Sequence, residues 1–121
     1  MVRPMYCSGV GKAILAELTK EEVLSVWSNS NIEKKTDNTI ISLKQLTVEL
    51  EQITECGYAL DDEENEIGVC CIAAAITDYN MKSRYTFSIS APSNRMTKER
   101  IKELSAHVLQ IQEELLKRIT G

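Results

Sequence analysis

Several features are scarce or absent in this chain, and each scarcity excludes a class of protein. No run of about 18 apolar residues occurs, so no membrane-spanning helix is expected. Residues 1–12 lack the basic-then-apolar order of a secretion signal, and we therefore expect a cytoplasmic location without membrane contact. Basic residues (14) are fewer than acidic ones (18), and the net charge of −4 disfavours a nucleic-acid surface, which needs clustered Lys and Arg. These residues are not expected to bind DNA.

Thiol and imidazole groups are also few. The four cysteines have no Cys-x-x-Cys spacing, and the adjacent Cys70 and Cys71 point to opposite faces if they lie in a strand. We expect all four to be reduced. The single histidine, His107, falls in a predicted helix and is interpreted as a surface residue. Neither a metal site nor a cofactor is predicted.

What the chain does contain is typical of one soluble domain. Its 121 residues are 43% hydrophobic and 26% charged. A chain of this length can bury about two-thirds of its unfolded surface. No internal repeat, low-complexity tract or second domain is visible, so residues 1–121 are predicted to form a single domain.

Four helices are predicted from capping residues and apolar spacing. Ser8, Thr19 and Ser42 each precede an apolar run of helical period, the first of which reaches Leu18. Thr19 and Ser42 also have Glu or Gln three residues later, the pattern of a capping box, and Gly57 can end the third helix. A long helix is expected from residue 97, with apolar residues every three or four positions: Ile101, Leu104, Val108, Ile111, Leu115 and Ile119. Residues 28–38 are almost entirely polar and are predicted to be a connection.

Three strands are predicted between the third helix and the last. They are Tyr58–Leu60, Val69–Thr77 and Tyr85–Ser90, the last of which alternates apolar and small polar residues. Residues 78–80 have turn chemistry, which predicts an antiparallel hairpin between the two longer strands, and Pro92 follows the last one. The order of helices, strands and helix indicates an α+β domain.

The glycine-rich start of the first helix is a candidate binding segment. Ser8–Gly11 offers backbone N–H groups to a carboxylate or phosphate, and the alternative interpretation is a capped helix packed close to a neighbour. The letters GVGK lack the spacing of a phosphate-binding loop, so no nucleotide role is predicted for Lys12.

An acidic segment follows the first strand and contains five carboxylates: Asp61, Asp62, Glu63, Glu64 and Glu66. We expect a solvated loop, since the segment lacks the alternating ligand spacing of a calcium loop. Asp61 differs from the others because it directly ends the strand. Its carboxylate is expected to point inward, where it would accept hydrogen bonds from ligand hydroxyls.

Cys71, Ser88 and Ser90 are further candidates. Cys71 shares a strand face with Ala73 and is interpreted as a small buried residue, the alternative being a nucleophile paired with His107. Ser88 and Ser90 share one strand face, and no GxSxG motif surrounds either. Two hydroxyls, a thiol, a carboxylate and a helix N-terminus favour recognition of a small polar ligand over covalent chemistry.

Three separated motifs occur in the order SGVGKAILAEL, GYALDDEENEIGVCCIAA and FSISAPSNRMT. They are similar to the patterns GKAxLA, GYxxDDEExxxGxxCIAA and xSISGPxxRxT of one family, and the chain resembles the effector-binding domain of IclR-family bacterial transcription regulators. The resemblance implies a GAF-like α+β fold, with an antiparallel sheet flanked by helices. It also implies that the chain is the C-terminal portion of that domain, without the DNA-binding helix-turn-helix domain.

The resemblance further implies a function without catalysis. Such a domain binds a small organic acid that modulates operator binding, and family members commonly form homodimers or tetramers. Carried over by position, the acid-binding backbone amides fall on Gly9 and Val10, and an apolar wall of the pocket falls on Val69. The polar groups of the pocket fall on Asp61, Cys71, Ser88 and Ser90.

Two alternatives stay open beside this hypothesis. One is an enzyme acting on a small carboxylic acid with Cys71 as nucleophile, and the other is a dimerisation domain with a degenerate pocket. Within the effector hypothesis, the aromatic content of 5% favours a small aliphatic acid over a large aromatic one. Ala75 and Ala91 depart from the proline and glycine often found at these positions in the family.

Overall fold

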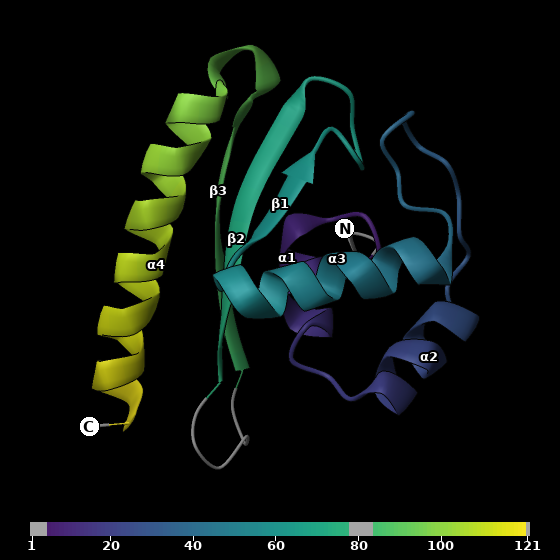
Figure 1. Ribbon diagram of the computed structural model, residues 1–121, viewed down its shortest axis with the longest axis horizontal. Helices are drawn as coiled ribbons and strands as arrows, with labels where there is room; N and C mark the ends of the chain where they lie inside the picture. Colours follow the sequence, from purple (N-terminus) through teal and green to yellow (C-terminus); the bar gives the residue numbers. More distant parts are fainter. Residues whose placement is uncertain (1–4, 78–83, 121) are drawn as a thin grey trace.

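The computed structural model describes residues 5–77 and 84–120 and has the α+β architecture that the sequence predicts. Its elements, in chain order, are α1 (Gly9–Leu15), α2 (Lys20–Ser28), α3 (Leu43–Cys56), β1 (Ala59–Asp62), β2 (Val69–Thr77), β3 (Arg84–Pro92), the 3-10 helix η1 (Ser93–Arg95) and α4 (Lys98–Thr120). In Figure 1, α4 covers one face of the sheet, and α1 and α3 lie on the other, with α2 further out. An antiparallel sheet flanked by helices is therefore confirmed.

The three strands form one sheet in the order β1-β2-β3, with both pairs antiparallel. The register places Asp61 of β1 opposite Cys71 of β2, and Cys71 opposite Ser90 of β3. Because successive side chains of a strand point to opposite faces, odd-numbered residues of β2 face α1 and even-numbered ones face α4. The turn expected at residues 78–80 lies outside the described residues, but the antiparallel pairing that it implied is confirmed.

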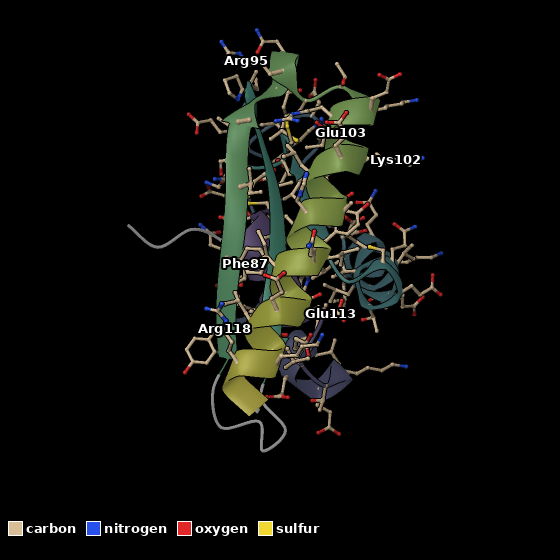
Figure 2. All side chains as sticks on the ribbon, turned by 90° about the vertical axis from the view of Figure 1, so that its left-hand side faces the viewer. Phe87, Arg95, Lys102, Glu103, Glu113 and Arg118 are labelled. Atoms are coloured by element: carbon tan, nitrogen blue, oxygen red, sulfur yellow. The ribbon has the colours of Figure 1, made fainter. Side chains whose placement is uncertain are left out.

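The layer beneath α4 is an apolar core. Its most deeply buried side chains are Cys70, Ile72, Ala74 and Val108. Figure 2 shows Phe87 beside α4, and Phe87 packs against this core, whereas the Glu113 side chain is exposed. Ile111 was predicted on the buried stripe but is 40% exposed, because position 112 faces the sheet instead: Gln112 Nε2 donates to the Ala75 carbonyl at 2.7 Å. Within the described ranges no helix is both long and apolar enough to span a membrane.

The opposite face carries small side chains, which let α1 lie close to the sheet. Ala59, Ala73 and Ala75 are buried there. A Cβ atom added to Gly9 would lie 3.1 Å from Cys71 Sγ and 3.4 Å from Ala73 Cβ. Larger residues would push α1 away from β2, so the close packing of α1 follows from this pairing of glycine with small strand residues.

The predicted helix starts are confirmed. The side chains of Ser8, Thr19 and Ser42 each accept a hydrogen bond from the backbone N–H three residues later. Thr19 and Glu22 form a complete capping box. Gly57 ends α3 with a φ of 89°, a left-handed conformation that other L residues adopt only at a cost.

Some boundaries differ from the prediction. α1 ends at Leu15 and not at Leu18, because the chain closes a tight turn there, in which the Leu18 N–H bonds the Leu15 carbonyl at 3.1 Å. β1 begins and ends later than predicted, at Ala59 and Asp62, and β3 extends beyond Tyr85–Ser90 at both ends. In both strands the pairing with β2 decides the length, and side-chain alternation does not report where such pairing stops.

Candidate functional site

The start of α1 lies against the middle of the sheet, and this contact brings most of the predicted site residues together. Gly9 approaches Cys71 of β2 closely. Cys71 lies in register between Asp61 on β1 and Ser90 on β3, and Ser88 precedes Ser90 by two residues on the same face. Residues from four elements therefore converge on one face of the sheet, as expected for parts of a single site.

The converging side chains differ in exposure. Asp61 and Cys71 are 3% and 1% exposed, whereas Ser88 and Ser90 are exposed. Strand order alone does not explain the difference, because β1 and β3 are both edge strands of the described sheet. Asp61 is buried where the chain folds back over it, so that the Glu64 N–H donates to its carboxylate. A ligand on this face would meet buried groups at β1 and β2 and reach solvent along β3.

The two remaining predicted residues, Val10 and Val69, flank this group. Val10 follows Gly9 in the first turn of α1, where backbone N–H groups have no acceptor inside the helix; its side chain packs on the core between α1 and α3. Val69 points to the same face as Cys71, lies opposite Pro92 and is half-buried. The placement of Val69 is compatible with its predicted role as an apolar wall.

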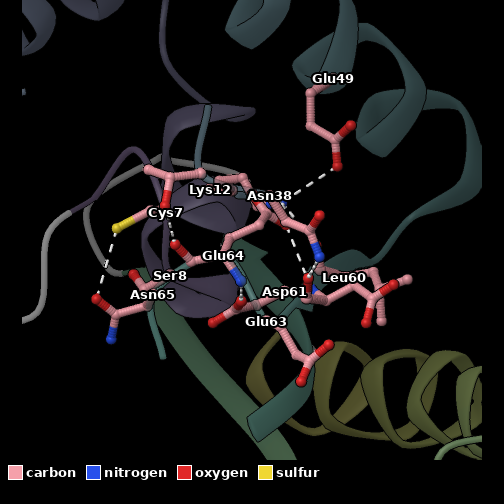
Figure 3. A network of polar contacts seen from close by, with 12 residues as sticks. Cys7, Ser8, Lys12, Asn38, Glu49, Leu60, Asp61, Glu63, Glu64 and Asn65 are labelled. Atoms are coloured by element: carbon pink, nitrogen blue, oxygen red, sulfur yellow. Dashed lines mark hydrogen bonds and ion pairs between the residues drawn. The ribbon is translucent and has the colours of Figure 1, made fainter. Parts of the chain in front are cut away.

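Asp61 points into the protein as predicted. Its Oδ1 accepts a hydrogen bond of 2.9 Å from the backbone N–H of Glu64 (Figure 3). Glu64 is also buried, at 7% exposure. The prediction of a solvated acidic segment is thus wrong for Glu64, whereas Asp61 was expected to point inward.

Lys12 pairs with the buried Glu64 carboxylate and offsets the cost of burying its charge. Its Nζ donates to both Glu64 carboxylate oxygens at 2.7 and 3.0 Å, to Glu49 Oε1 at 3.1 Å and to the Leu60 carbonyl at 2.6 Å. The lysine is 0% exposed. An ammonium group has three N–H donors, and these acceptors come from three residues, so the buried cation is fully satisfied. Sequence reasoning gave Lys12 no role and missed this cluster.

The Glu64 carboxyl titrates near neutrality in this environment. Burial raises its pKa from 4.5 to about 7, and the attraction of Lys12 opposes that rise without cancelling it. The neighbouring carboxylates of Asp61 and Glu49 raise the pKa further. The cluster can therefore take up a proton in the physiological range.

The polar connection between α2 and α3 closes over the acidic segment. Asn38 Nδ2 donates to the Asp62 carbonyl at 3.0 Å, and the hydroxyls of Thr36 and Thr39 donate to the next two carbonyls. Both threonines are buried. The connection between α2 and α3, predicted to be a loop from its composition, therefore fixes the backbone of the acidic segment that carries Asp61 and Glu64.

The thiols have no arrangement for nucleophilic catalysis. All four cysteines are free, as predicted, and burial raises the pKa of Cys7 and of Cys70 to about 11. Cys71 faces α1, whereas His107 is exposed on α4, which packs on the other face of the sheet. The alternative of a Cys71–His107 pair is therefore wrong. Among the described residues, no group of His, Cys, Asp and Glu is arranged to hold a metal ion.

One signal in the sequence pointed to the missed cluster. Lys12 is the only charged residue of α1, between Gly11 and Ala13, and a charge among small and apolar residues is rarely buried unless it is paired. The acidic segment supplied partners, but local spacing does not show that α1 crosses beneath it. Glu49, on α3, carried no sequence signal at all.

The sequence matches the family described as "Bacterial transcriptional regulator IclR C-terminal" over residues 1–116. The chain belongs to the IclR family of bacterial transcriptional regulators. The Acetate operon repressor of Salmonella typhimurium is 37% identical over 112 residues, which are 93% of this chain and 41% of that repressor. This IclR-family chain thus spans less than half the length of that relative, whose name describes transcriptional repression and not catalysis.

Solved structures agree with the family. The C-terminal domain of the Escherichia coli regulator KdgR matches with a TM-score of 0.87 and 30% identity, covering 98% of this chain and 73% of that one. A double mutant of the inducer-binding domain of PobR from Acinetobacter, in complex with 3-hydroxybenzoic acid, has a TM-score of 0.82. It is 21% identical and covers 93% of this chain and 65% of that one, so it supports the fold alone.

Proposed function

We propose that residues 1–121 are the C-terminal portion of an effector-binding domain that senses a small organic acid. The observation that carries the proposal is the convergence of Gly9, Asp61, Cys71 and Ser90 on one face of the sheet. A carboxylate near the Gly9 and Val10 amides would leave the other polar atoms of the effector near one carboxylate, one thiol and the serine hydroxyls. Family membership supports this assignment.

The chemistry of the site favours a short aliphatic acid. None of the seven proposed site residues is aromatic, and Asp61 can accept hydrogen bonds from effector hydroxyls but would repel a second anionic group. The proposed occupant is therefore a monocarboxylate with a keto or hydroxyl group. The PobR double mutant is in complex with an aromatic acid, and at 21% identity this does not transfer to the present chain.

The role of the whole protein follows from the same proposal. An effector that binds one conformation better than another shifts the equilibrium between them, and this shift would modulate operator binding by a separate DNA-binding domain. We propose that the regulator acts in the cytoplasm as a homodimer or tetramer.

Thermal unfolding against pyruvate, lactate, succinate and 3-hydroxybenzoate tests the proposal. A ligand that binds only the folded state stabilises it by about 2.7 kcal/mol at 100 times its Kd. We expect pyruvate or lactate to raise the melting temperature most. No shift with any of the four acids would contradict the small-acid proposal, and a larger shift with 3-hydroxybenzoate would contradict the aliphatic preference.

Variants locate the binding. Asp61→Asn keeps an oxygen that can accept the Glu64 N–H, and Ser90→Ala removes one exposed hydroxyl, so both should fold while losing most of the ligand-induced shift. Thr86→Val is the matched control, because Thr86 points to the same face of β3 but lies opposite Ala75, away from Gly9. An equal loss of the shift in Thr86→Val would argue against a site at Gly9.

A further inference from the structure

We propose that Lys12 is a positioning residue that directs the Asp61 carboxylate toward the effector site by holding both ends of the segment from Leu60 to Glu64. The proposal rests on the effector-binding function. It goes beyond that function by assigning a role to a side chain outside the predicted site.

The first support is the pattern of contacts around Asp61. Lys12 Nζ binds the carbonyl of Leu60, the residue before Asp61, at 2.6 Å. It also binds the Glu64 carboxylate at 2.7 Å, and the backbone N–H of Glu64 donates to Asp61 Oδ1 at 2.9 Å. Lys12 therefore acts on Asp61 through the residues on both sides of it, as Figure 3 shows.

The second support is that α1 carries both Gly9 of the candidate effector site and Lys12. Gly9, where an added Cβ would meet Cys71, and Lys12 lie within a single turn of α1. The geometry of Asp61 relative to the effector amides is thus set by α1 itself. A displacement of α1 by a bound effector would also move the acidic segment, which Thr36 and Thr39 hold from the other side.

The third support is burial without any unsatisfied group. Lys12 is 0% exposed and Glu64 is 7% exposed, and no buried side-chain nitrogen or oxygen among the described residues lacks a partner. By contrast, the ion pair of Lys117 with Glu113, at 3.6 Å, is exposed to solvent. A completely paired buried network tends to specify one arrangement of the groups it contacts.

The cluster also supplies a pH-dependent readout. Opening of the segment would expose Glu64 and return its pKa from about 7 toward 4.5, so the closed form binds an additional proton between these values. Closure is therefore favoured as pH falls, and protection of the Glu64 amide against hydrogen exchange should rise about twentyfold from pH 7.5 to 5.5. The titratable and charged groups facing Glu64 are Lys12 from α1, Glu49 from α3, Asp61 and Asp62 from β1 and Cys7 from the segment before α1.

Hydrogen exchange at the backbone amide of residue 64 tests the proposal, because this N–H reports the bond to Asp61 directly. The double variant Lys12→Met/Glu64→Gln removes both members of the buried ion pair together, so Glu64 is not left without its cation, and it is expected to fold. In it the amide of residue 64 should exchange at least tenfold faster than in the wild type, relative to Ile72 and Ile89 in the sheet. Unchanged protection at residue 64 would overturn the proposal.

The pH profile separates positioning from a merely structural role. In the wild type, protection at residue 64 should rise as pH falls, whereas in Glu64→Gln it should be flat. A profile that is equally steep in both proteins would overturn the assignment. The amides of Ile72 and Ile89 serve as internal references, since they lie in the central and edge strands of the sheet.

Pyruvate binding distinguishes this proposal from the proposed function. Loss of the pyruvate-induced thermal shift in the folded double variant supports positioning by Lys12. An unchanged shift in that variant overturns it while the effector site stands. If the wild type does not respond to pyruvate, the effector assignment loses support, and exchange at residue 64 still decides whether Lys12 positions Asp61.

Discussion

Lys12→Met is expected to lower the free energy of unfolding by about 3–5 kcal/mol, the usual cost of removing one partner of a buried ion pair. The variant leaves the buried Glu64 carboxylate without its cation and the Leu60 carbonyl without its donor. Methionine fills a similar volume, so the loss would be electrostatic and not a loss of packing. Urea unfolding of wild type and variant at pH 8 measures the difference directly.

The pH dependence of this loss has a defined sign. Glu64 has a folded-state pKa of about 7 and an unfolded-state value near 4.5, so the folded protein binds the additional proton and gains stability as pH falls through this range. A protonated Glu64 no longer needs a cation. The cost of Lys12→Met should therefore be smaller at pH 5.5 than at pH 8, and a larger cost at pH 5.5 would contradict the assigned pairing.

Two further variants control for nonspecific effects. Lys117→Met makes the same substitution in an exposed pair with Glu113 and should leave the melting temperature nearly unchanged. Lys12→Met combined with Glu64→Gln should recover much of the lost stability, because residue 64 is then no longer a buried charge without its cation. A double variant as unstable as Lys12→Met would indicate that lysine packing, and not its charge, holds the segment.

Gly11→Ala is expected to destabilise the fold by about 3 kcal/mol, at the upper end of the range for overpacking. A Cβ atom at this position would lie 2.4 Å from Met5 Cα and 2.6 Å from both the Met5 carbonyl oxygen and Ser8 Oγ. The first two are backbone atoms, which cannot move aside as the end of a side chain would. The segment before α1 would have to shift, and with it the capping hydroxyl of Ser8.

The sign of this effect makes the prediction specific. In an ordinary helix interior, replacing glycine by alanine is favourable by about 0.5–1 kcal/mol. Ser25→Ala, at an exposed position of α2, is the control and should change the melting temperature little. A Gly11→Ala variant as stable as the wild type would mean that residues 5–8 do not pack over α1 as described.

Both predictions concern the same structural unit. Lys12 and Gly11 are adjacent on α1, and their contacts depend on β1, on α3 and on the segment before α1. Short helices have little stability of their own and depend on tertiary packing. The order of the candidate effector site therefore depends on the contacts that α1 makes with the rest of the fold.

The sequence by itself determined the local elements. Ser8, Thr19 and Ser42 start helices because their side chains satisfy backbone N–H groups within three residues, and Gly57 ends α3 because it adopts a positive φ at low cost. The alternation along β3 showed that Ser88 and Ser90 share a face. These properties follow from interactions between neighbours in the chain, and the family motifs predicted the positions of the candidate site.

Only the tertiary structure decided the burial and partners of the charged residues. Lys12 contacts residues 37 to 52 positions away, and the burial of Glu64 depends on Thr39 and on α3. Ser90 is exposed while Asp61 and Cys71 in the same row are buried, and this difference depends on which segments fold over each strand. Local sequence patterns specify hydrogen bonds over a few residues, whereas burial and pKa depend on segments that meet only when the chain has folded.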